Sequence, residues 1–366
     1  MSATRALRTL VIHPGASWAT ADVFYGLVHG LRQHGVWVDQ YRLDTRIPWS
    51  VKSLHAMWRI RKKTEPDLPK PNQADFMYHA GVGALEMALR YQVDVVIVVS
   101  AMLMHPDIVA MMKQAGLRVV VLFTESPYDE EKELAFAKLV DGGWTNERSS
   151  VAKFRSVNPH FGYLPHGWHP EKHYVSSRAV GELPSHDVVF VGSGFAERIT
   201  WFNSIDWTGI DLGLYGSWKD LGLNKQVTAL VRGEPIDNEK AAALYRRAKI
   251  GLNLYRTLKG WGRSMGTSGR ITHAESLSPR AYELAACGVF HLSEHRAEVS
   301  EVFGDLVPTF STPTEAAALM RLWLKDDQGR ARIAEQLPAC VAEHSWVSRA
   351  AIVLGDLHRL IHQQAA

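Results

Sequence analysis

The stretch from Ile271 to Gly288, ITHAESLSPRAYELAACG, decides how the rest of the chain is interpreted. Its second half predicts a helix that Ser278 can cap, that Pro279 suits in the first turn, and that Gly288 ends. Such a helix start presents backbone amides and a partial positive charge. An anionic group such as a diphosphate is favoured there.

Two glutamates and an arginine surround this predicted helix start. Glu275 lies in the preceding loop, and Glu283 lies one turn inside the helix. Arg280 adds a fixed cation beside the predicted anion site. A carboxylate at Glu283 can accept hydrogen bonds from ribose hydroxyls. We therefore interpret Glu275, Ser278, Arg280 and Glu283 as a nucleotide-sugar clamp.

The Glu-x7-Glu element ending in YELAACG resembles the donor-binding motif of retaining GT-B glycosyltransferases. It is especially similar to the spore-maturation-type branch, within glycosyltransferase group 1. The resemblance implies that Glu275 contacts the donor sugar and Glu283 the ribose. It also implies an α/β fold of the GT-B type: two Rossmann-like parallel-sheet lobes, a cleft between them and a C-terminal helix that crosses back.

Length and composition agree with a two-domain globular protein. The chain has 366 residues, a net charge of +3 and a pI near 8.7, which permits an anionic partner without requiring one. Cys287 and Cys340 provide no disulfide framework. With neither an export signal nor a long apolar stretch in the sequence, we expect a cytoplasmic protein.

The first lobe begins with alternating strands and helices. We predict strands over 7–12, 36–43, 93–100 and 118–123, and a first helix over 21–33. This order argues for a parallel sheet, whose ligands gather at the carboxyl ends of its strands. The acceptor-side candidates therefore follow strands: His13, Ser17, Trp18, Asp22, Ser100, His105 and Glu125.

Four of these residues are our catalytic candidates. Glu125 and His105 are the leading pair, and His13 and Asp22 are the others. A histidine or carboxylate after a strand is also typical of a helix cap or a turn. Both interpretations stay open on the sequence alone.

Residues 49–73 interrupt the alternating pattern, before a helix that we expect over 82–91. Trp58, Arg59 and Arg61 belong to a basic, aromatic segment that is followed by three prolines. One interpretation is a solvated loop or helix end. The other is a surface that meets an anionic acceptor such as nucleic acid, by stacking and phosphate contact.

The lobe boundary is expected near Trp168. The sequence LPHGWHP at 164–170 resembles the linker between the lobes of this family. The resulting domains are an acceptor-binding lobe at 1–168 and a nucleotide-sugar-binding lobe at 169–345. The closing helix, at 346–366, is expected to pack back on the first lobe.

The second lobe repeats the strand-and-turn pattern. A strand at 187–194 delivers Gly192, Ser193 and Gly194, and Arg198 follows. Glycine backbone and an arginine can approach a phosphate, although a plain turn with a solvated arginine fits equally. We expect further strands at 209–215, 227–233 and 248–254.

Two further features of the second lobe bear on the donor. By resemblance, the donor base contacts Gly233, Glu234 and Pro235. The glycine-rich insertion at 255–270 is either a lid over a diphosphate or a flexible solvent loop.

The predicted reaction is transfer of a sugar from a nucleotide diphosphate donor, which we expect to be UDP-linked, to an acceptor in the first lobe. No Asp-x-Asp pair occurs in the sequence, so no metal is implied and no cofactor beyond the donor is expected. The resemblance implies retention of configuration without a protein nucleophile. An inverting enzyme would need a base, for which Glu125 and His105 are the first candidates.

Several alternatives stay open. The acceptor is a small molecule, lipid or cell-surface polymer, or it is DNA with hydroxylated bases, as for some phage-encoded relatives. The protein can also be a catalytically silent nucleotide-sugar-binding protein, or an epimerase that uses no acceptor.

Overall fold

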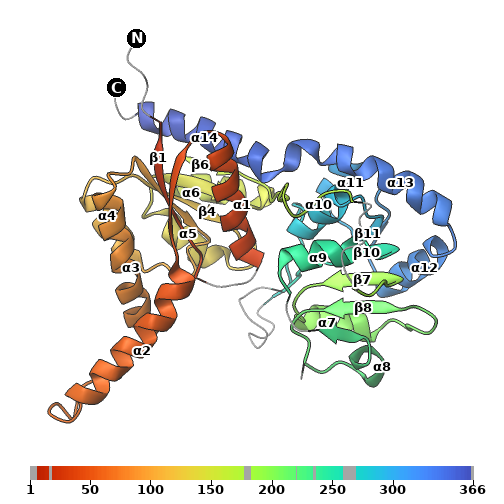
Figure 1. The fold of residues 1–366 in the computed structure, drawn as a ribbon, viewed down its shortest axis with the longest axis horizontal. Coiled ribbons are helices and arrows are strands. Elements are labelled where there is room, and N and C mark those ends of the chain that lie inside the picture. The colour runs from red at the N-terminus through yellow and green to blue at the C-terminus, as the bar shows by residue number, and fades with distance from the viewer. Residues whose placement is uncertain are drawn as a thin grey trace. The chain divides into compact units, whose positions relative to one another are not determined.

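The computed structural model describes residues 6–15, 19–176, 183–219, 221–233, 236–258 and 269–363. The chain divides into two compact units (Figure 1). Unit 1 comprises 1–164 together with 347–366, and unit 2 comprises 165–346. Each unit contains one six-stranded sheet whose strands all pair in parallel. The prediction of two parallel-sheet α/β lobes is confirmed.

The sheet of unit 1 has the strand order β2-β1-β3-β4-β5-β6. Its central strands read VVIVV and VVVLF and are buried throughout, because helices cover both faces of a parallel sheet. The strands are β1 Arg8–Ile12, β2 Trp37–Tyr41, β3 Val95–Val99, β4 Val119–Phe123, β5 Gly142–Thr145 and β6 Phe161–Tyr163.

The helices of unit 1 follow its strands and close its core. They are α1 Ala19–Gln33, α2 Leu43–Arg61, α3 Gln73–Arg90, α4 Pro106–Gln114, α5 Glu130–Ala137, the 3-10 turn η1 Arg148–Ser150, α6 Val151–Val157 and α14 Trp346–Gln363. Stacked rings of Phe123, Phe154 and Phe161 fill one side, with centroids 5.2 to 5.7 Å apart.

Helix α14 is attached to the sheet of unit 1 by two polar contacts. The indole N–H of Trp144 donates to Asp356 Oδ2 at 2.7 Å, and Arg118 Nη1 donates to the carbonyl of Leu360 at 2.9 Å. The last helix of the chain therefore completes the first unit, although the whole of unit 2 separates them in sequence.

Unit 2 has the strand order β12-β11-β10-β7-β8-β9. Its strands are β7 Val188–Val191, β8 Leu212–Tyr215, β9 Val231–Gly233, β10 Ile250–Asn253, β11 His291–Glu294 and β12 Thr309–Phe310. Its helices are α7 Ala196–Asn203, α8 Lys225–Thr228, α9 Asn238–Tyr245, α10 Pro279–Ala286, α11 Ala297–Phe303, α12 Pro313–Trp323, α13 Asp327–Cys340 and the 3-10 turn η2 Ala342–His344.

Three sequence-based assignments were wrong. Residues 49–61 of the predicted interruption at 49–73 belong to α2, a helix of 19 residues that contains Pro48 in its second turn. Helix α3 begins nine residues before 82, at a capping box of Asn72 and Asp75. The predicted strand at 227–233 begins as α8 and becomes extended only in β9.

The described residues include no helix long and apolar enough to cross a lipid bilayer.

Two glycines test the packing of unit 1. An added Cβ at Gly355, inside α14, would meet nothing closer than Arg359 Nη1 at 3.9 Å. Gly355→Ala should therefore raise the free energy of unfolding by roughly 0.5–1 kcal/mol, because alanine loses less backbone entropy in a helix. At Gly143 the same atom would lie 2.2 Å from the carbonyl oxygen of Val121. Gly143→Ala should lower stability by about 1–3 kcal/mol or more.

Urea unfolding of both variants beside the wild type checks this pair. Equal midpoints for the two alanine variants would contradict the close packing of β5 against β4.

Candidate functional site

Unit 2 has a topological switch point between β7 and β10. These strands are neighbours in the sheet, yet the chain leads from β7 toward β8 on one side and from β10 toward β11 on the other. Loops diverge at such a point, and ligands of doubly wound sheets bind beside it, at the carboxyl ends of the strands. The carboxyl ends here are Val191 and Asn253.

Arg280, in the first turn of α10, joins the ends of both strands. Its Nε and Nη2 donate to the carbonyl of Val191 at 2.9 and 2.6 Å. Its Nη1 reaches the carbonyl of Leu254 at 3.3 Å and Asn253 Oδ1 at 3.4 Å. All of these acceptors are neutral, and within the described chain no carboxylate forms an ion pair with Arg280.

A second arginine lies against the same groups. Arg198 Nη2 donates to the Leu254 carbonyl at 2.9 Å, and Nη1 donates to the Ser193 carbonyl at 3.1 Å. The guanidinium carbons of Arg280 and Arg198 lie 4.3 and 5.3 Å from the centre of the Phe190 ring. Two cations thus share one carbonyl and one aromatic ring.

The glycines of the β7 loop make room for these side chains. An added Cβ at Gly192 would lie 2.7 Å from Arg280 Nη2, and one at Gly194 would lie 2.8 Å from the Trp218 ring. The sequence suggested that these glycines admit a phosphate. The structure gives them a further reason, which is the close packing of Arg280 and Trp218.

The start of α10 differs from the prediction in one respect. Pro279 occupies the first turn and Gly288, at φ +65°, follows the end, as predicted. Ser278 is wrong as a capping residue, because its hydroxyl donates to Asn253 Oδ1 at 2.8 Å and caps no amide. The first turn of α10 therefore lacks a side-chain cap, which leaves its amides suited to an anion.

The loop carrying Glu275 is held by residues that the sequence analysis missed. Glu298 is buried and accepts the Leu277 amide at 2.6 Å, while its own amide donates to the Glu275 carbonyl at 3.2 Å. Arg296 donates to the Ser276 carbonyl at 2.6 Å. The only sequence signal for this role was the pair of charged residues Arg296 and Glu298 at the start of α11.

Glu283 is buried in α10 and faces the start of α9. Asn238, the first residue of α9, donates its side-chain amide to Glu283 Oε1 at 3.3 Å. Glu283 and Arg280 thus belong to one helix start, whereas Gly233 lies at the end of β9. Glu234, Pro235, Ser17, Trp18 and most of the predicted lid at 255–270 lie outside the described residues.

In unit 1, His13 follows β1 and is buried. The Gly15 amide donates to its Nδ1 at 3.0 Å, so the neutral ring carries its proton on Nε2. Burial lowers the pKa of His13 to about 4, against the opposing influence of Asp44, whose carboxylate lies 3.7 Å away. Near pH 7 His13 is a hydrogen-bond donor rather than a base.

Polar atoms without partners mark the same edge of this sheet. Ser100 Oγ, Thr124 Oγ1 and Asn146 Oδ1 are buried and accept or donate no hydrogen bond within the described chain. They follow the neighbouring strands β3, β4 and β5. Ser100 and Ala101 also have positive φ values of 66° and 60°, a strain common at functional sites.

Glu125 stands in a loop fixed by a buried carboxyl group. Glu133 Oε1 accepts the Glu125 amide at 3.0 Å, and its Oε2 accepts a short hydrogen bond from the Ser126 hydroxyl. Asn146 donates to the Ser126 carbonyl at 3.1 Å. Burial raises the pKa of Glu133 to about 8, so this carboxyl group is largely protonated at neutral pH.

The remaining candidates of unit 1 have local roles. His105 caps α4, because its Nδ1 accepts the Asp107 amide at 3.2 Å, and Asp22 lies in the first turn of α1. Trp58 is half-buried, and its indole N–H donates to the Leu68 carbonyl at 3.1 Å. Arg61 is paired with Glu65 at 2.7 Å, whereas Arg59 is exposed.

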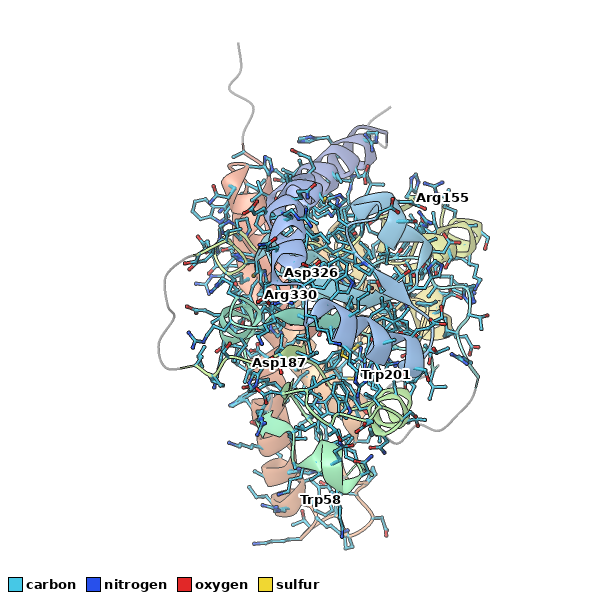
Figure 2. The ribbon with its side chains drawn as sticks, turned by 90° about the vertical axis from the view of Figure 1, so that its right-hand side faces the viewer. Trp58, Arg155, Asp187, Trp201, Asp326 and Arg330 are labelled. Carbon is cyan, nitrogen blue, oxygen red and sulfur yellow. The ribbon has the colours of Figure 1, made fainter. Side chains whose placement is uncertain are left out.

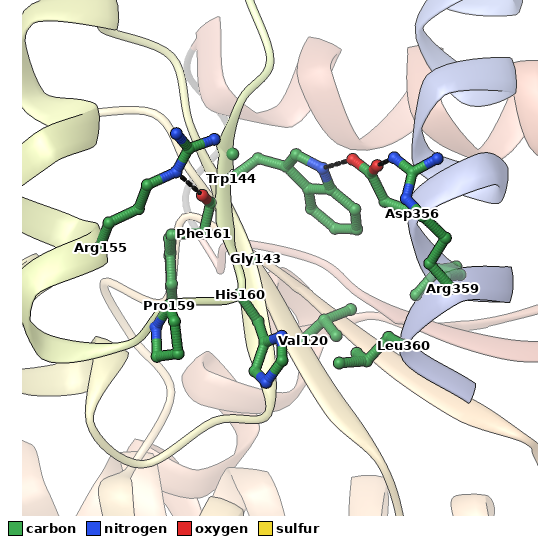
Figure 3. Close-up of a pocket in the computed structure, with 12 residues that line it drawn as sticks. Val120, Gly143, Trp144, Arg155, Pro159, His160, Phe161, Asp356, Arg359 and Leu360 are labelled. Carbon is green, nitrogen blue, oxygen red and sulfur yellow. Dashed lines mark hydrogen bonds and ion pairs between the residues drawn. The ribbon is translucent and has the colours of Figure 1, made fainter. Parts of the chain in front are cut away.

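A pocket of about 240 Å³ lies elsewhere in unit 1. Figure 3 shows its lining residues, which include residues of β5, β6, α14 and the segment before β6, among them Arg155 and His160. Its lining contains none of the candidate residues. We therefore do not assign the reaction to it.

Comparison with known proteins supports the two-lobed interpretation. Residues 198–355 match a family described as glycosyl transferase-like. No curated protein sequence matches the chain.

Several solved structures share the fold over nearly the whole chain. Sucrose-phosphate synthase from Thermosynechococcus elongatus is 13% identical, with a TM-score of 0.64 over 98% of this chain and 100% of that one. Anabaena Alr3699/HepE, solved with UDP-glucose, is 9% identical, with a TM-score of 0.62 over 95% and 99%. A putative UDP-N-acetylglucosamine 2-epimerase from Listeria monocytogenes is 11% identical, with a TM-score of 0.57 over 99% and 98%. At these identities the likeness establishes the fold, and the predicted GT-B fold is confirmed.

The buried Glu133 makes the stability of unit 1 depend on pH. Its pKa is raised from 4.5 to about 8, so its contribution is complete below pH 4.5 and is lost as pH rises toward 8. Glu133→Gln, which cannot ionise, should flatten the fall in the free energy of unfolding over this window.

Urea unfolding at pH 5, 6.5 and 8 measures the effect. The exposed Glu131 of the same helix provides the control, Glu131→Gln, which should keep the wild-type slope. Parallel slopes for wild type and Glu133→Gln would show that this carboxyl group does not titrate there.

Proposed function

We propose that the protein is a glycosyltransferase of the GT-B type and that its donor is a nucleoside diphosphate sugar linked to UDP. The observation that carries the proposal is the pair of arginines at the switch point of unit 2. Arg198 and Arg280 share the Leu254 carbonyl, and Arg280 has only neutral acceptors in the described chain. Their repulsion falls when a dianion binds beside them.

The neighbouring groups fit the rest of such a donor. The uncapped amides of α10 add donors for the diphosphate, and the buried carboxylate of Glu283 can accept from ribose hydroxyls. Glu275, on the loop before α10, is proposed to contact the sugar. That HepE was solved with UDP-glucose supports uridine as the base.

The proposed acceptor site is the carboxyl edge of the sheet in unit 1. A hydroxyl-rich acceptor would satisfy Ser100, Thr124 and Asn146, whose buried oxygens have no partner in the described chain. His13 would donate from Nε2. Glu125, in the loop held by Glu133, is the proposed carboxylate on this side.

The proposed reaction is transfer with retention and without a metal. The bond from the anomeric carbon to the diphosphate breaks, the acceptor oxygen bonds to that carbon, and the acceptor proton passes to the departing phosphate oxygen. Arg280, Arg198 and the α10 amides would stabilise the charge that develops on this phosphate. They supply the positive charge that a metal supplies in other transferases.

UDP should stabilise the protein against thermal unfolding, and uridine should do so much less. At about 100 times its dissociation constant, UDP should add roughly 2.7 kcal/mol. Glu283→Gln should weaken UDP binding about tenfold through the loss of a charged acceptor. The exposed Glu335 of α13 provides the control, because Glu335→Gln should bind UDP as the wild type does.

Calorimetric titration and release of UDP from UDP-sugars complete this test. Failure of all diphosphates to bind would refute the donor site. Binding without UDP release on any acceptor would favour the silent binding protein.

Gly192→Ala tests the arginine directly. The new methyl group would displace the end of Arg280, whose Nη2 lies 2.7 Å from the position that an added Cβ takes. We expect weaker binding of UDP with little change for uridine, because the lost contact is to the diphosphate. At Gly162 of unit 1 a Cβ meets nothing closer than 3.4 Å, so Gly162→Ala is the control. Equal loss for UDP and uridine would mean a general disruption of unit 2.

A further inference from the structure

Helices α2 and α3 form a hairpin, residues 43–90, that we call the basic hairpin. The two helices pack side by side and extend away from the sheet of unit 1 (Figure 1). With 19 residues, α2 is about 28 Å long. Trp58 lies near the far end of the basic hairpin (Figure 2).

One face of α2 is used for packing within unit 1. Residues 47, 51, 54 and 58 recur at steps of three and four and are half-buried. The Trp58 indole donates to the Leu68 carbonyl, and Ser50 Oγ lies 3.1 Å from His79 Nδ1 of α3. This inner face needs no further partner.

The opposite face carries exposed apolar side chains, of which Trp49 also stacks one side of its ring on His79 of α3, with the centroids 5.2 Å apart. Ile60 is 69% exposed, Trp49 is 55% exposed and Met57 is 53% exposed. Lysine and arginine side chains lie between these apolar residues, both in the sequence and on the surface of the helix. We define the outer face by its exposed residues Trp49, Lys52, Met57, Arg59, Ile60 and Lys63.

The charge around the outer face has a single sign. Between Thr45 and Thr64 the sequence contains no aspartate or glutamate, and it contains six lysines and arginines. Arg61 is paired with Glu65, and Lys62 lies over the Trp58 ring at 4.7 Å. Lys52, Arg59 and Lys63 form no ion pair within the described residues.

We propose that the outer face of the basic hairpin docks on the surface of an anionic lipid bilayer. Exposed isoleucine, methionine and tryptophan insert among acyl chains, and flanking lysines and arginines reach the anionic headgroups. The tryptophan enriched at membrane interfaces is here Trp49.

Nucleic acid fits this face less well than lipid does. Phosphate contacts use the cations, but they leave Ile60 and Met57 in water. The aromatic ring predicted to stack on bases, Trp58, is instead turned toward Leu68. An anionic bilayer can contact both the apolar and the basic side chains of the outer face.

The test is co-sedimentation of the full chain with vesicles of phosphatidylcholine, with or without anionic phosphatidylglycerol. We expect binding to the anionic vesicles that weakens with added salt. Met57→Ser with Ile60→Ser should reduce binding about tenfold or more, because two inserting side chains are lost. Arg59→Glu with Lys63→Glu should have a similar effect by removing the charge attraction.

Leu322→Ser on α12 is the matched control, because Leu322 is also exposed, at 61%. It should sediment like the wild type. Circular dichroism and stabilisation by UDP show that each variant is folded. The UDP measurement also separates the two proposals, because a failed donor site in unit 2 leaves vesicle binding by unit 1 intact.

Three results would overturn the proposal. They are no sedimentation with anionic vesicles at low salt, equal loss of binding in the Leu322→Ser control, and salt-dependent binding of duplex DNA by the outer face without vesicle binding. The last result would assign the outer face to nucleic acid.

Discussion

The hydrogen bonds of Arg280 are the contact on which the candidate site of unit 2 depends. One side chain from α10 ties the end of β7 to the end of β10, the two strands between which the chain changes direction. Gly192 must lack a side chain for this arginine to fit, and Asn253 must be polar to meet both Arg280 and Ser278. The cost of partly burying this charge is offset by charge-assisted hydrogen bonds to the carbonyls of Val191 and Leu254.

The two units differ in how the polar groups at the carboxyl ends of their strands are paired. In unit 2 the groups at the switch point are bonded to one another, so the positive charge is held in a fixed place before any ligand binds. In unit 1 the oxygens of Ser100, Thr124 and Asn146 are buried without partners in the described chain, and the backbone at Ser100 is strained. The preorganised cation and the unsatisfied polar edge are the features on which the proposed donor and acceptor sites rest.

In each unit, a buried carboxyl group holds the loop that carries a candidate site residue. Glu133 fixes the loop of Glu125 in unit 1, and Glu298 fixes the loop of Glu275 in unit 2. Each accepts a backbone amide of the loop that it holds. In each unit, therefore, the loop that carries a candidate glutamate owes its conformation to a second glutamate from a following helix.

Residue patterns along the chain were sufficient to predict the alternation of strands and helices, the glycosyl transferase-like element and the limits of α10. These features are local: apolar runs, a proline in a first turn and a glycine at positive φ express their preferences over a few residues. The prediction was wrong where a local signal was ambiguous. In α2, Pro48 and a run of lysines and arginines did not indicate the helix that the structure contains.

Which polar groups contact one another became known only from the folded arrangement of the strands. Asn253, Arg296 and Glu298 are unremarkable in the sequence and become parts of the site because parallel strands bring their carboxyl ends to one edge. The same holds for Ser278, whose hydroxyl turns from its expected cap to Asn253. Hydrogen bonds between residues distant in sequence depend on strand order and register, which local propensity does not specify.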